Sequence, residues 1–361
     1  MSTPDWIRVQ PGAANYYAYA GALDQIEQFH PSSTLKRVLW IGGKRAQASA
    51  APYLPPLFND SRSIRETFSG HCSESAVSRY VQLGHDADLI IGIGGGSALD
   101  TAKAVAHRLG KPFVAIPTIA ATCAAWTPLS VWYDDHGKAL GYELFPLASR
   151  LVLVEPRILL AAPADYLRAG IGDTLAKWYE ARVLCEAETS LPLTAQIGLS
   201  VARQIHDVLI EEGPAALAAA ASGTLSDSFL RVVDAVIAGG GLVGGLGERH
   251  TRLAAAHSIH NGLTVLPETA RFLHGAKVAY GILVQLALEE RRDELRHLDA
   301  ALNILGIPRR LADLDVDIAQ SERIEAFIAH TLRSGESIHF LPGKIDSARL
   351  RHALTAVETL S

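Results

Sequence analysis

Cysteine is scarce in this chain of 361 residues, and the three present, Cys72, Cys123 and Cys185, are far apart in the sequence. They form neither a disulfide framework nor a CxxC metal site, which suits a reducing compartment. The sequence contains no uninterrupted run of the roughly 18 apolar residues that a membrane-spanning helix needs. Its start, MSTPDWIRVQPG, lacks the basic and then apolar order of a signal peptide. We therefore expect a cytoplasmic protein without a membrane partner.

Positive charge is also limited, because 33 Lys and Arg residues against 38 Asp and Glu residues leave a formal net charge of −5. Nucleic acid is not expected as a partner, since phosphate backbones are bound by basic surfaces. A hydrophobic share of 48% with 20% charged residues is typical of a globular protein. The length exceeds what one hydrophobic core commonly supports, so two domains are expected.

Short β-branched runs alternate with helical stretches in the first part of the chain. These runs are 37–43 (RVLWIGG), 64–70 (IRETFSG), 87–96 (ADLIIGIGGG), 113–118 (FVAIPT) and 150–156 (RLVLVEP). Strands separated by helices indicate βαβ units and a parallel sheet. Beyond residues 156–163 the pattern is helical, over segments 166–186, 194–212, 228–244 and 274–290. The prediction is an α/β then all-α chain, with a Rossmann-like domain over 1–159, a helical domain over 160–361 and an active site in the cleft between them.

A glycine-rich turn follows the third predicted strand, in IIGIGGGSALDTAKAVAHRLG. Gly94, Gly95 and Gly96 stand between a strand and a helix that begins near Ser97. Without side chains the backbone can approach a pyrophosphate, whose charge the free N–H groups of the helix then bind. The third glycine of the Rossmann fingerprint is missing, and a simple tight turn is the alternative. The strand-loop-helix context favours a dinucleotide cofactor in the first domain.

The end of the first predicted strand indicates which cofactor is bound. An acidic side chain there would accept hydrogen bonds from the ribose of NAD, but the strand ends Gly42-Gly43-Lys44-Arg45. No carboxylate repels a 2′-phosphate, and two cations are available to bind it. The alternative is that Lys44 and Arg45 only begin a solvated helix. Gly43 and Lys44 are candidate cofactor residues, and NADP(H) is favoured over NAD(H).

The helical half contains a candidate metal site. Asp173 stands early in a helix, in GIGDTLAKWYEA, and His274 begins another, in FLHGAKVAYG. His257 and His260 are three residues apart in AAAHSIHNG and share a helix face. One carboxylate and two imidazoles on rigid helices form a three-ligand site with an open position, which suits catalytic Zn²⁺ and also Fe²⁺. With 14 histidines in the chain, many of them core or cap residues, composition alone does not select these.

Seven segments resemble the motifs of a known family, in this order: GGGSALDTAKAVA, PTIAAT, LSVWY, LVLVEP, AGIGDTLAKWYEA, AAAHSIHNGLTVLPET and FLHGAKVAYGILVQ. They are similar to the iron-containing alcohol dehydrogenase superfamily, in its glycerol dehydrogenase branch. The resemblance covers most of the chain and weakens towards the ends. FSGHCSES and PTIAATCAAWTPLSVWY resemble the bacterial hydroxycarboxylate dehydrogenases, which are NADPH-linked and reduce 2-oxo acids. The resemblance implies the dehydroquinate synthase-like fold, a bound divalent metal and a homo-oligomer.

The resemblance also implies the functional residues. The metal ligands of the family fall on Asp173, His257 and His274. Its pyrophosphate loop falls on Gly96, Ser97, Ala98, Leu99 and Asp100, and its further cofactor contacts on Thr118, Ala121, Thr127, Leu129 and Tyr133. His260 is a candidate catalytic residue that relays a proton to solvent, with a purely structural role beside His257 as the alternative. Candidate cations for a substrate carboxylate, by their distance in sequence from the ligands, are Lys177, Arg252 and Lys277.

Cys123 is the main departure from the glycerol dehydrogenases, which have at this position an aspartate that hydrogen-bonds substrate hydroxyls. Cysteine is a poor acceptor, and the missing charge favours an anionic substrate. Two unit charges about 4 Å apart would repel by about 4 kcal/mol at an effective dielectric near 20. Trp126 adds apolar bulk nearby. We therefore predict a substrate contact at Cys123 and a small 2-oxo or 2-hydroxy acid as substrate, with an NAD-dependent glycerol or small-polyol dehydrogenase as the alternative.

Two other classes of protein are alternatives to this prediction. A dehydroquinate-synthase-like cyclase would use the same cofactor and metal, but the motif spelling around Asp173 and His257 argues against it. A catalytically silent nucleotide-binding protein would not need three metal ligands, and all three are present. The sequence therefore predicts a metal-dependent oxidoreductase that transfers hydride between NAD(P)H and a small-molecule substrate.

Overall fold

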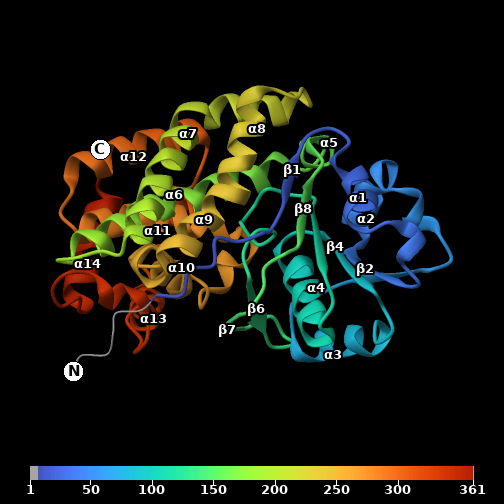
Figure 1. Ribbon diagram of the computed structural model, residues 1–361. Helices are drawn as coiled ribbons and strands as arrows, with labels where there is room; N and C mark the ends of the chain where they lie inside the picture. The colour runs from blue at the N-terminus through green and yellow to red at the C-terminus, as the bar shows by residue number, and fades with distance from the viewer. Residues whose placement is uncertain (1–6, 361) are drawn as a thin grey trace. The chain divides into compact units, whose positions relative to one another are not determined.

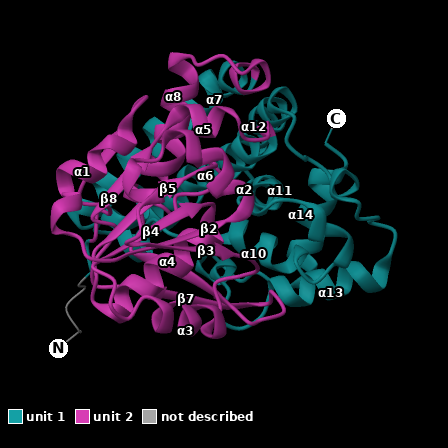
Figure 2. Ribbon diagram, turned by 90° about the vertical axis from the view of Figure 1, so that its right-hand side faces the viewer, with its two compact units in different colours: residues 1–9, 165–217, 243–361 teal, residues 10–164, 218–242 magenta. Residues whose placement is uncertain are grey.

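The computed structural model describes residues 7–360, so the first six residues of the segment compared with a signal peptide lie outside the described residues. The chain forms two compact units, which are coloured separately in Figure 2. Unit 1 comprises Met1–Val9, Asp165–Leu217 and Val243–Ser361, and unit 2 comprises Gln10–Ala164 and Ala218–Leu242. The stretch 218–242 therefore groups with the first half of the chain. The expected division into functional domains at residues 159 and 160 stays a prediction.

A six-stranded parallel sheet forms the centre of unit 2, in the order β1-β8-β5-β4-β2-β3. Its strands are β1 (Tyr16–Ala18), β2 (Val38–Gly43), β3 (Ser63–Phe68), β4 (Leu89–Gly94), β5 (Phe113–Pro117) and β8 (Leu151–Val154). The five strands expected from the β-branched runs are confirmed, and β1 is an additional strand of three residues. Strands β4, β5 and β8 are buried throughout, as expected for strands covered on both faces.

The order of the strands reverses between β2 and β4. The chain passes from β2 outward to β3 and then returns to form β4 on the other side of β2. Ligands in open α/β sheets bind at the carboxyl ends of the strands, at such a reversal. Gly42 pairs with Ile93, so the glycines that end β2 and β4 lie at this edge of the sheet.

Helices and a small hairpin complete unit 2. The helices are α1 (Gln25–Phe29), α2 (Lys44–Ala50), α3 (Glu74–Leu83), α4 (Gly96–Leu109), α5 (Pro156–Leu160) and α8 (Asp227–Asp234). Helix α4 packs on the strand that precedes it, as Figure 1 shows. Strands β6 (Leu129–Tyr133) and β7 (Ala139–Leu144) form an antiparallel hairpin that the sequence pattern did not predict, and β7 is almost entirely exposed.

Unit 1 is helical, as the second half of the sequence predicts. The helices with most of their residues in this unit are α6 (Ala164–Glu186), α7 (Leu193–Ser222), α9 (Gly240–Gly247), α10 (Ala255–Leu263), α11 (His274–Leu288), α12 (Arg292–Leu305), α13 (Ser321–Thr331) and α14 (Ser347–Glu358). Helix α11 packs against α10, α12 and α14, and it is buried without interruption over residues 278–286. It is the central helix of the unit.

The expected helix over 228–244 contains a π-helical turn, Ala235–Gly239, between α8 and α9. The longer run Asp227–His250 is apolar and long enough to cross a membrane by composition alone. Within it, 61% of the most apolar window is buried inside the protein, as in the core helix of a globular fold.

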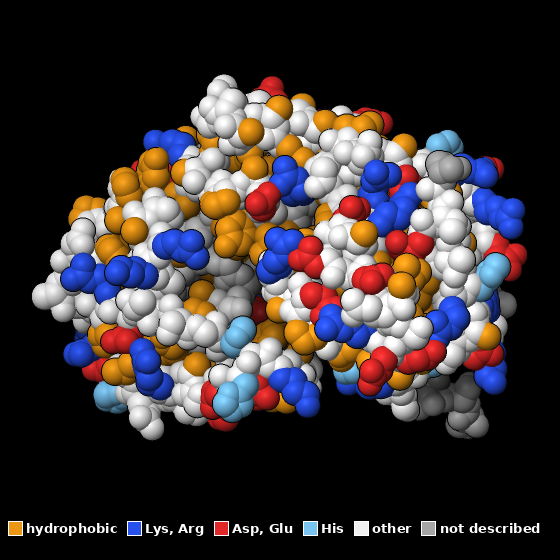
Figure 3. Space-filling model, turned by 180° about the vertical axis from the view of Figure 1, so that it is seen from behind, with side chains coloured by type: hydrophobic (Ala, Val, Ile, Leu, Met, Phe, Trp, Pro, Cys, Tyr) orange, Lys and Arg blue, Asp and Glu red, His pale blue; other side chains and the backbone are white. Residues whose placement is uncertain are grey.

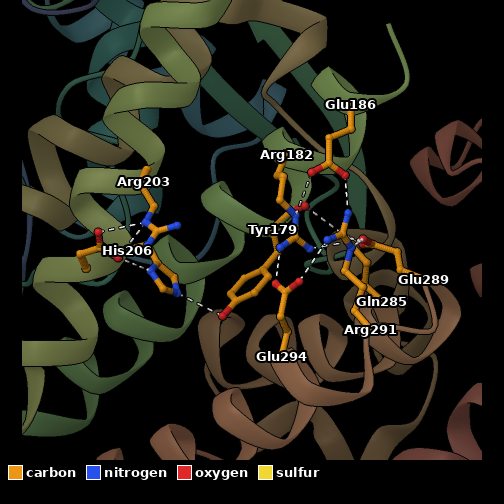
Figure 4. A network of polar contacts seen from close by, with 10 residues as sticks. Tyr179, Arg182, Glu186, Arg203, His206, Gln285, Glu289, Arg291 and Glu294 are labelled. Atoms are coloured by element: carbon orange, nitrogen blue, oxygen red, sulfur yellow. Dashed lines mark hydrogen bonds and ion pairs between the residues drawn. The ribbon is translucent and has the colours of Figure 1, made fainter.

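A buried network of charged side chains holds α6 to α11 and α12 (Figure 4). Arg182, only 7% exposed, donates hydrogen bonds to Glu294 and, at 3.3 Å, to Glu289. Arg291 and Gln285 also donate to Glu289, at 3.0 and 2.9 Å. Burial raises the pKa of Glu289, so its charge depends on these donors. The network therefore fixes the position of α6 within the unit.

The surface carries charges of both signs, and acidic and basic side chains are interspersed over the face shown in Figure 3. Some form exposed ion pairs, such as Arg296 with Asp293 at 3.0 Å. Exposed pairs contribute only about 0–1 kcal/mol each to stability. The buried network of Figure 4 is therefore the stronger electrostatic contribution to the fold.

Replacing Arg182 by alanine is expected to lower the free energy of unfolding by about 3 kcal/mol, because Glu289 stays buried without one of its guanidinium partners. Arg296→Ala is the matched control, since the Arg296 side chain is 59% exposed and pairs with Asp293 outside this network. Its expected loss is below about 1 kcal/mol. Urea unfolding followed by circular dichroism measures both, and equal losses would contradict a stabilising role for the buried network.

Candidate functional site

Three side chains from three helices of unit 1 converge on one point. Asp173 of α6, His257 of α10 and His274 at the start of α11 offer ligand atoms that lie within 4.8 Å of one another. The Oδ1 atom of Asp173 is 3.5 Å from His257 Nε2 and 3.1 Å from His274 Nε2. The structure therefore brings together the three residues that the sequence predicts as metal ligands.

These residues fit a divalent cation. Asp173 is buried, and its Oδ1 atom accepts no hydrogen bond from the described residues. A buried carboxylate oxygen without a partner is unfavourable, and a bound cation would remove that penalty. One carboxylate and two imidazoles form a donor set that Zn²⁺ and Fe²⁺ accept. The His274 side chain is 40% exposed, so the site is accessible to solvent on that side.

Glu180 orients His257. It lies seven residues after Asp173 on α6, two turns along the same helix face. Its Oε2 atom is 2.7 Å from His257 Nδ1, and its Oε1 atom accepts hydrogen bonds from the N–H groups of Ala254 and His257, at 2.8 and 3.1 Å. Ala254 has no capping side chain, so Glu180 caps the start of α10 from another helix. Sequence reasoning missed Glu180, although its spacing from Asp173 was a usable signal.

Burial and charge act in opposite directions on the pKa values of these groups. Burial would raise the pKa of Asp173, but the imidazoles of His274 and His257 hold it well below its usual value. Burial also raises the pKa of Glu180, but the charge and hydrogen bond of His257, the charge of Lys177 and the Ala254 N–H group together lower it below its usual value. Burial lowers the pKa of His257, but the Glu180 carboxylate raises it to about 9 overall. His257 must therefore lose a proton before its Nε2 atom can bind a metal at neutral pH.

His260 is in contact with His274. Its Nε2 atom is 2.9 Å from His274 Nδ1, and its Nδ1 atom is 3.1 Å from Asn261 Oδ1. Asn261 in turn donates a hydrogen bond from Nδ2 to Glu336 at 3.0 Å. Burial, followed by the charge of His274, lowers the pKa of His260 well below its usual value. The structure thus places His260 behind a candidate ligand, and its role as a proton relay stays a prediction.

Two glycines let α6 and α11 approach each other beside the ligands. A Cβ atom at Gly275 would lie 1.7 Å from the carbonyl oxygen of Ala169, and one at Gly172 would lie 2.5 Å from that of Gly275. Such contacts are too short for any side chain. Gly172 directly precedes Asp173, and Gly275 directly follows His274. The close approach of the two helices therefore brings these two ligands together.

The three candidate cations for a substrate carboxylate differ in their surroundings. Lys277 is buried, its Nζ atom lies 3.4 Å from Thr269 O, and burial lowers its pKa. The Nη1 atom of Arg252 is buried and has no hydrogen-bond partner among the described residues. The charge of Lys177 acts on Asp173, whose pKa it lowers. A role of these cations in binding substrate stays a prediction.

In unit 2 the predicted cofactor residues gather at the carboxyl edge of the sheet. The loop Gly94–Gly96 joins β4 to α4, and Gly94 has a φ of +153°, which residues with side chains rarely adopt. Gly43 ends β2, and Lys44 is exposed at the first position of α2. The Thr118 N–H group, which follows β5, donates to Gly94 O at 3.1 Å. This is the edge where a dinucleotide is expected.

The loop that follows β5 carries Cys123. A Cβ atom at Gly96 would lie 3.6 Å from Thr122 Oγ1 and 3.8 Å from Ala124 Cβ, so this loop runs beside the glycine loop. Cys123 is half-buried there. The other predicted contacts of this region, also half-buried, are Ala121, Thr127, Leu129 and Tyr133. The structure therefore places Cys123 on a loop beside the glycine loop, and Leu129 and Tyr133 at the two ends of strand β6, which follows that loop.

Asp100 has surroundings that the sequence did not indicate. It is buried in α4, where its Oδ1 atom accepts a hydrogen bond from Lys103 Nζ and its Oδ2 atom one from the Val131 N–H group, both at 3.1 Å. Lys103 also donates to two carbonyl groups of the segment 124–129. The pair ties α4 to this segment. The neighbouring residues that are also buried are Ala98 and Leu99, and cofactor contacts of all three stay predictions.

Trp126 is used in packing. Its indole N–H group donates to Pro11 O at 2.6 Å, and its ring lies 5.5 Å from that of Tyr16 in an edge-on arrangement. A Cβ atom at Gly12 or Gly241 would collide with the indole, at 1.8 and 2.3 Å. The indole ring of Trp126 therefore packs against residues 11–16 and against Gly241 of unit 2.

The parallel sheet with a glycine loop at its carboxyl edge, and the helical unit with one carboxylate and two imidazoles at one point, are the features that the sequence predicts for a metal-dependent dehydrogenase. Residues 13–156 match the model of the family described as iron-containing alcohol dehydrogenase. The chain is 54% identical to hydroxycarboxylate dehydrogenase A of Escherichia coli (strain K12) over 98% of both chains. It is 39% identical to a glycerol dehydrogenase of Pseudomonas putida over 81% of both.

A solved structure supports the same assignment. The crystal structure of a probable glycerol dehydrogenase from Sinorhizobium meliloti 1021 is similar with a TM-score of 0.85 and 31% identity, over 98% of both chains. The chain therefore belongs to the iron-containing alcohol dehydrogenase family. The family and the fold predicted from the sequence are confirmed, and the chain is an oxidoreductase acting on CH–OH donors.

Gly275→Ala is expected to weaken Zn²⁺ binding about tenfold or more, because the added Cβ forces α11 away from Ala169 and displaces His274, whereas ligand distances vary by only about 0.2 Å. Gly213→Ala is the control, since the nearest atom to its Cβ is a flexible methyl group of Leu305 at 2.8 Å. Competition with a chelator measures the Kd of each variant. An unchanged Kd in Gly275→Ala would contradict this account of the helix contact.

At about pH 7.5 metal binding is expected to release about one proton from His257, since its pKa without metal is about 9 and a ligand imidazole must be neutral. The affinity should therefore increase as the pH rises towards 9 and level off above it. In Glu180→Gln the neutral amide no longer raises the pKa of His257 and only the hydrogen bond to Asp173 still does, so fewer protons should be released at this pH. Calorimetry of Zn²⁺ binding in buffers of different ionisation enthalpy counts the protons, and equal release by both proteins would refute the prediction.

Proposed function

We propose that the chain transfers hydride between NADP(H) and a small 2-oxo or 2-hydroxy carboxylic acid. The observation that carries this proposal is Cys123, a neutral residue beside the predicted phosphate loop where the glycerol dehydrogenases have an aspartate. A substrate carboxylate meets no repulsion from this position. The 54% identity to a protein named hydroxycarboxylate dehydrogenase A supports the same substrate class. The alternative, an NAD-dependent glycerol dehydrogenase, is favoured by the names of other relatives.

The cations at the end of β2 support NADP(H) as the cofactor. Lys44 and Arg45 are exposed, and the first turn of α2 contains no acidic residue. A 2′-phosphate accepts charge-assisted hydrogen bonds from such cations, whereas the ribose of NAD is bound by a carboxylate at the corresponding place. Gly43 and Lys44 would line the adenosine end of the cofactor, and the Gly94–Ser97 loop its pyrophosphate.

Asp173, His257 and His274 would hold one divalent ion, Zn²⁺ or Fe²⁺. When bound, such an ion polarises a carbonyl oxygen or stabilises an alkoxide. Glu180 keeps the Nε2 atom of His257 directed at the site, and the exposed side of His274 admits the substrate. Nicotinamide supplies or accepts the hydride. The oxygen of the reacting group must therefore reach the metal site while its carbon reaches the nicotinamide ring.

We also propose that the protein is cytoplasmic and assembles as a homo-oligomer. The assembly rests on the family resemblance. The location is supported by two of the three cysteines, Cys72 and Cys185, which are free and buried. Burial raises the pKa of Cys72 to about 12 and that of Cys185 to about 11, so these two thiols are unreactive. Free, buried thiols of this kind suit a reducing compartment.

The direct test is turnover of 2-oxobutyrate with NADPH and of glycerol with NAD, measured side by side on protein loaded with Zn²⁺, Fe²⁺ or Mn²⁺. The proposal predicts the higher kcat/KM for the 2-oxo acid with NADPH. A higher value for glycerol with NAD would establish the alternative, and a higher value for the 2-oxo acid with NADH would overturn the cofactor preference alone.

Cys123→Asp is expected to lower kcat/KM for 2-oxobutyrate by up to about a thousandfold, because a new carboxylate about 4 Å from the substrate carboxylate adds about 4 kcal/mol of repulsion. Cys123→Ser keeps a small neutral side chain and should retain most of the activity. Steady-state kinetics with saturating NADPH measures both variants. If the aspartate variant reduces the acid as well as the serine variant does, Cys123 does not lie near the substrate carboxylate.

A further inference from the structure

Behind His274 a chain of hydrogen bonds leads to a residue far away in the sequence. His274 Nδ1 is 2.9 Å from His260 Nε2, and His260 Nδ1 is 3.1 Å from Asn261 Oδ1. The Asn261 amide then donates to Glu336 Oε2 at 3.0 Å, across 75 positions of sequence. The chain thus connects an exposed candidate ligand with a carboxylate that no sequence motif marks.

The two ends of this chain determine the direction of every hydrogen bond in it. The Glu336 carboxylate only accepts, so Asn261 donates with Nδ2 and its Oδ1 accepts from the Nδ1–H group of His260. His260 then has a free lone pair on Nε2, which accepts from the Nδ1–H group of His274. His274 is left with its own lone pair on Nε2, the atom 3.1 Å from Asp173 Oδ1.

The residues that follow Glu336 fix it on α10. The Ser337 hydroxyl donates to Ala254 O at 2.5 Å and lies 3.1 Å from Ser258 Oγ, which accepts a hydrogen bond from the Ile338 N–H group at 2.9 Å. Glu336 itself is only 10% exposed. The backbone next to Glu336 is therefore held on α10, the helix that carries His257 and His260.

We propose that Glu336 is a positioning residue for His274. Acting through Asn261 and His260, it fixes the tautomer in which His274 presents the Nε2 lone pair to the metal site. This inference rests on the metal site proposed above. In this role His260 is a neutral link with one proton, on Nδ1.

The two imidazole ligands are thus oriented in different ways. Glu180, a buried carboxylate, accepts directly from His257 at 2.7 Å. His274 is connected to Glu336 only through two neutral side chains. A directly bound carboxylate raises the basicity of an imidazole ligand more than a remote one does. Removing Glu336 should therefore disturb the orientation of His274 without changing the charge next to it.

The first test is the Zn²⁺ affinity of four variants, measured by chelator competition. Glu336→Ala and His260→Phe each break the chain and should weaken binding by about 10–100-fold. His260→Gln should retain most of the affinity, because its amide can accept from His274 and donate to Asn261 although it cannot titrate. Arg333→Ala is the matched control, since it removes only the 2.8 Å ion pair at the other oxygen of Glu336.

A second readout needs no substitution. In Zn²⁺-loaded protein with ¹⁵N-labelled histidine, the NMR spectrum should show His260 and His274 both protonated on Nδ1. A proton on Nε2 of His260 would overturn the proposed direction of the chain, even if one of the variants fails to fold.

Asp173→Asn separates this inference from the metal site on which it rests. If Asp173→Asn binds Zn²⁺ as tightly as the unaltered chain, the metal site itself is wrong. If it binds weakly while Glu336→Ala and His260→Phe bind normally, the metal site stands and the positioning role is refuted. A loss in His260→Gln as large as that in His260→Phe would also refute it, because it would show that the imidazole ring is needed for more than its two hydrogen bonds.

Discussion

The buried carboxylate of Glu180 is the interaction on which the candidate metal site depends. Its two oxygens accept from the side chain of His257 and from two N–H groups at the start of α10. A third N–H group there, that of Ala256, donates to the side-chain oxygen of Gln285 on α11 at 3.1 Å. Helix α10 therefore begins on polar groups supplied by its two neighbours, without a cap of its own. The atoms that satisfy the helix end also orient the ligand it carries, so the position of α10 and the geometry of the site cannot vary independently.

Gln285 extends this dependence to the charged network of Figure 4. Its amide donates to Tyr179 O at 3.0 Å and to Glu289 at 2.9 Å, while its oxygen caps α10. One fully buried side chain thus connects the ion pairs that hold α6 against α11 with the helix that carries His257. A buried polar network of this kind is favourable only when every donor and acceptor in it has a hydrogen-bond partner. The rigidity of the site and the stability of the helical unit therefore have a common origin.

The parts of the molecule that the sequence predicted well are those with a local signal. Each of them lies in a short motif whose spacing has a physical meaning. They are the five β-branched runs, the turn Gly94–Gly96 and the three candidate metal ligands. Strand β7 carries no such signal, because it is exposed on both faces and shows no alternation. Glu336 was beyond reach for a different reason. It meets Asn261 only through tertiary packing, and neither residue is unusual in its own segment. The ion pair of Asp100 with Lys103 was also beyond reach, because its bond to the Val131 N–H group depends on how α4 packs on β6.

That ion pair also bears on motion within unit 2. Lys103 and Asp100 join α4, which begins at the glycine loop, to the backbone of residues 124–131. The loop with Cys123 directly precedes this segment and runs beside Gly96. Both loops are therefore tethered to one helix and should shift together as a rigid body. A displacement of the start of α4 would therefore be transmitted to the loop that carries Cys123.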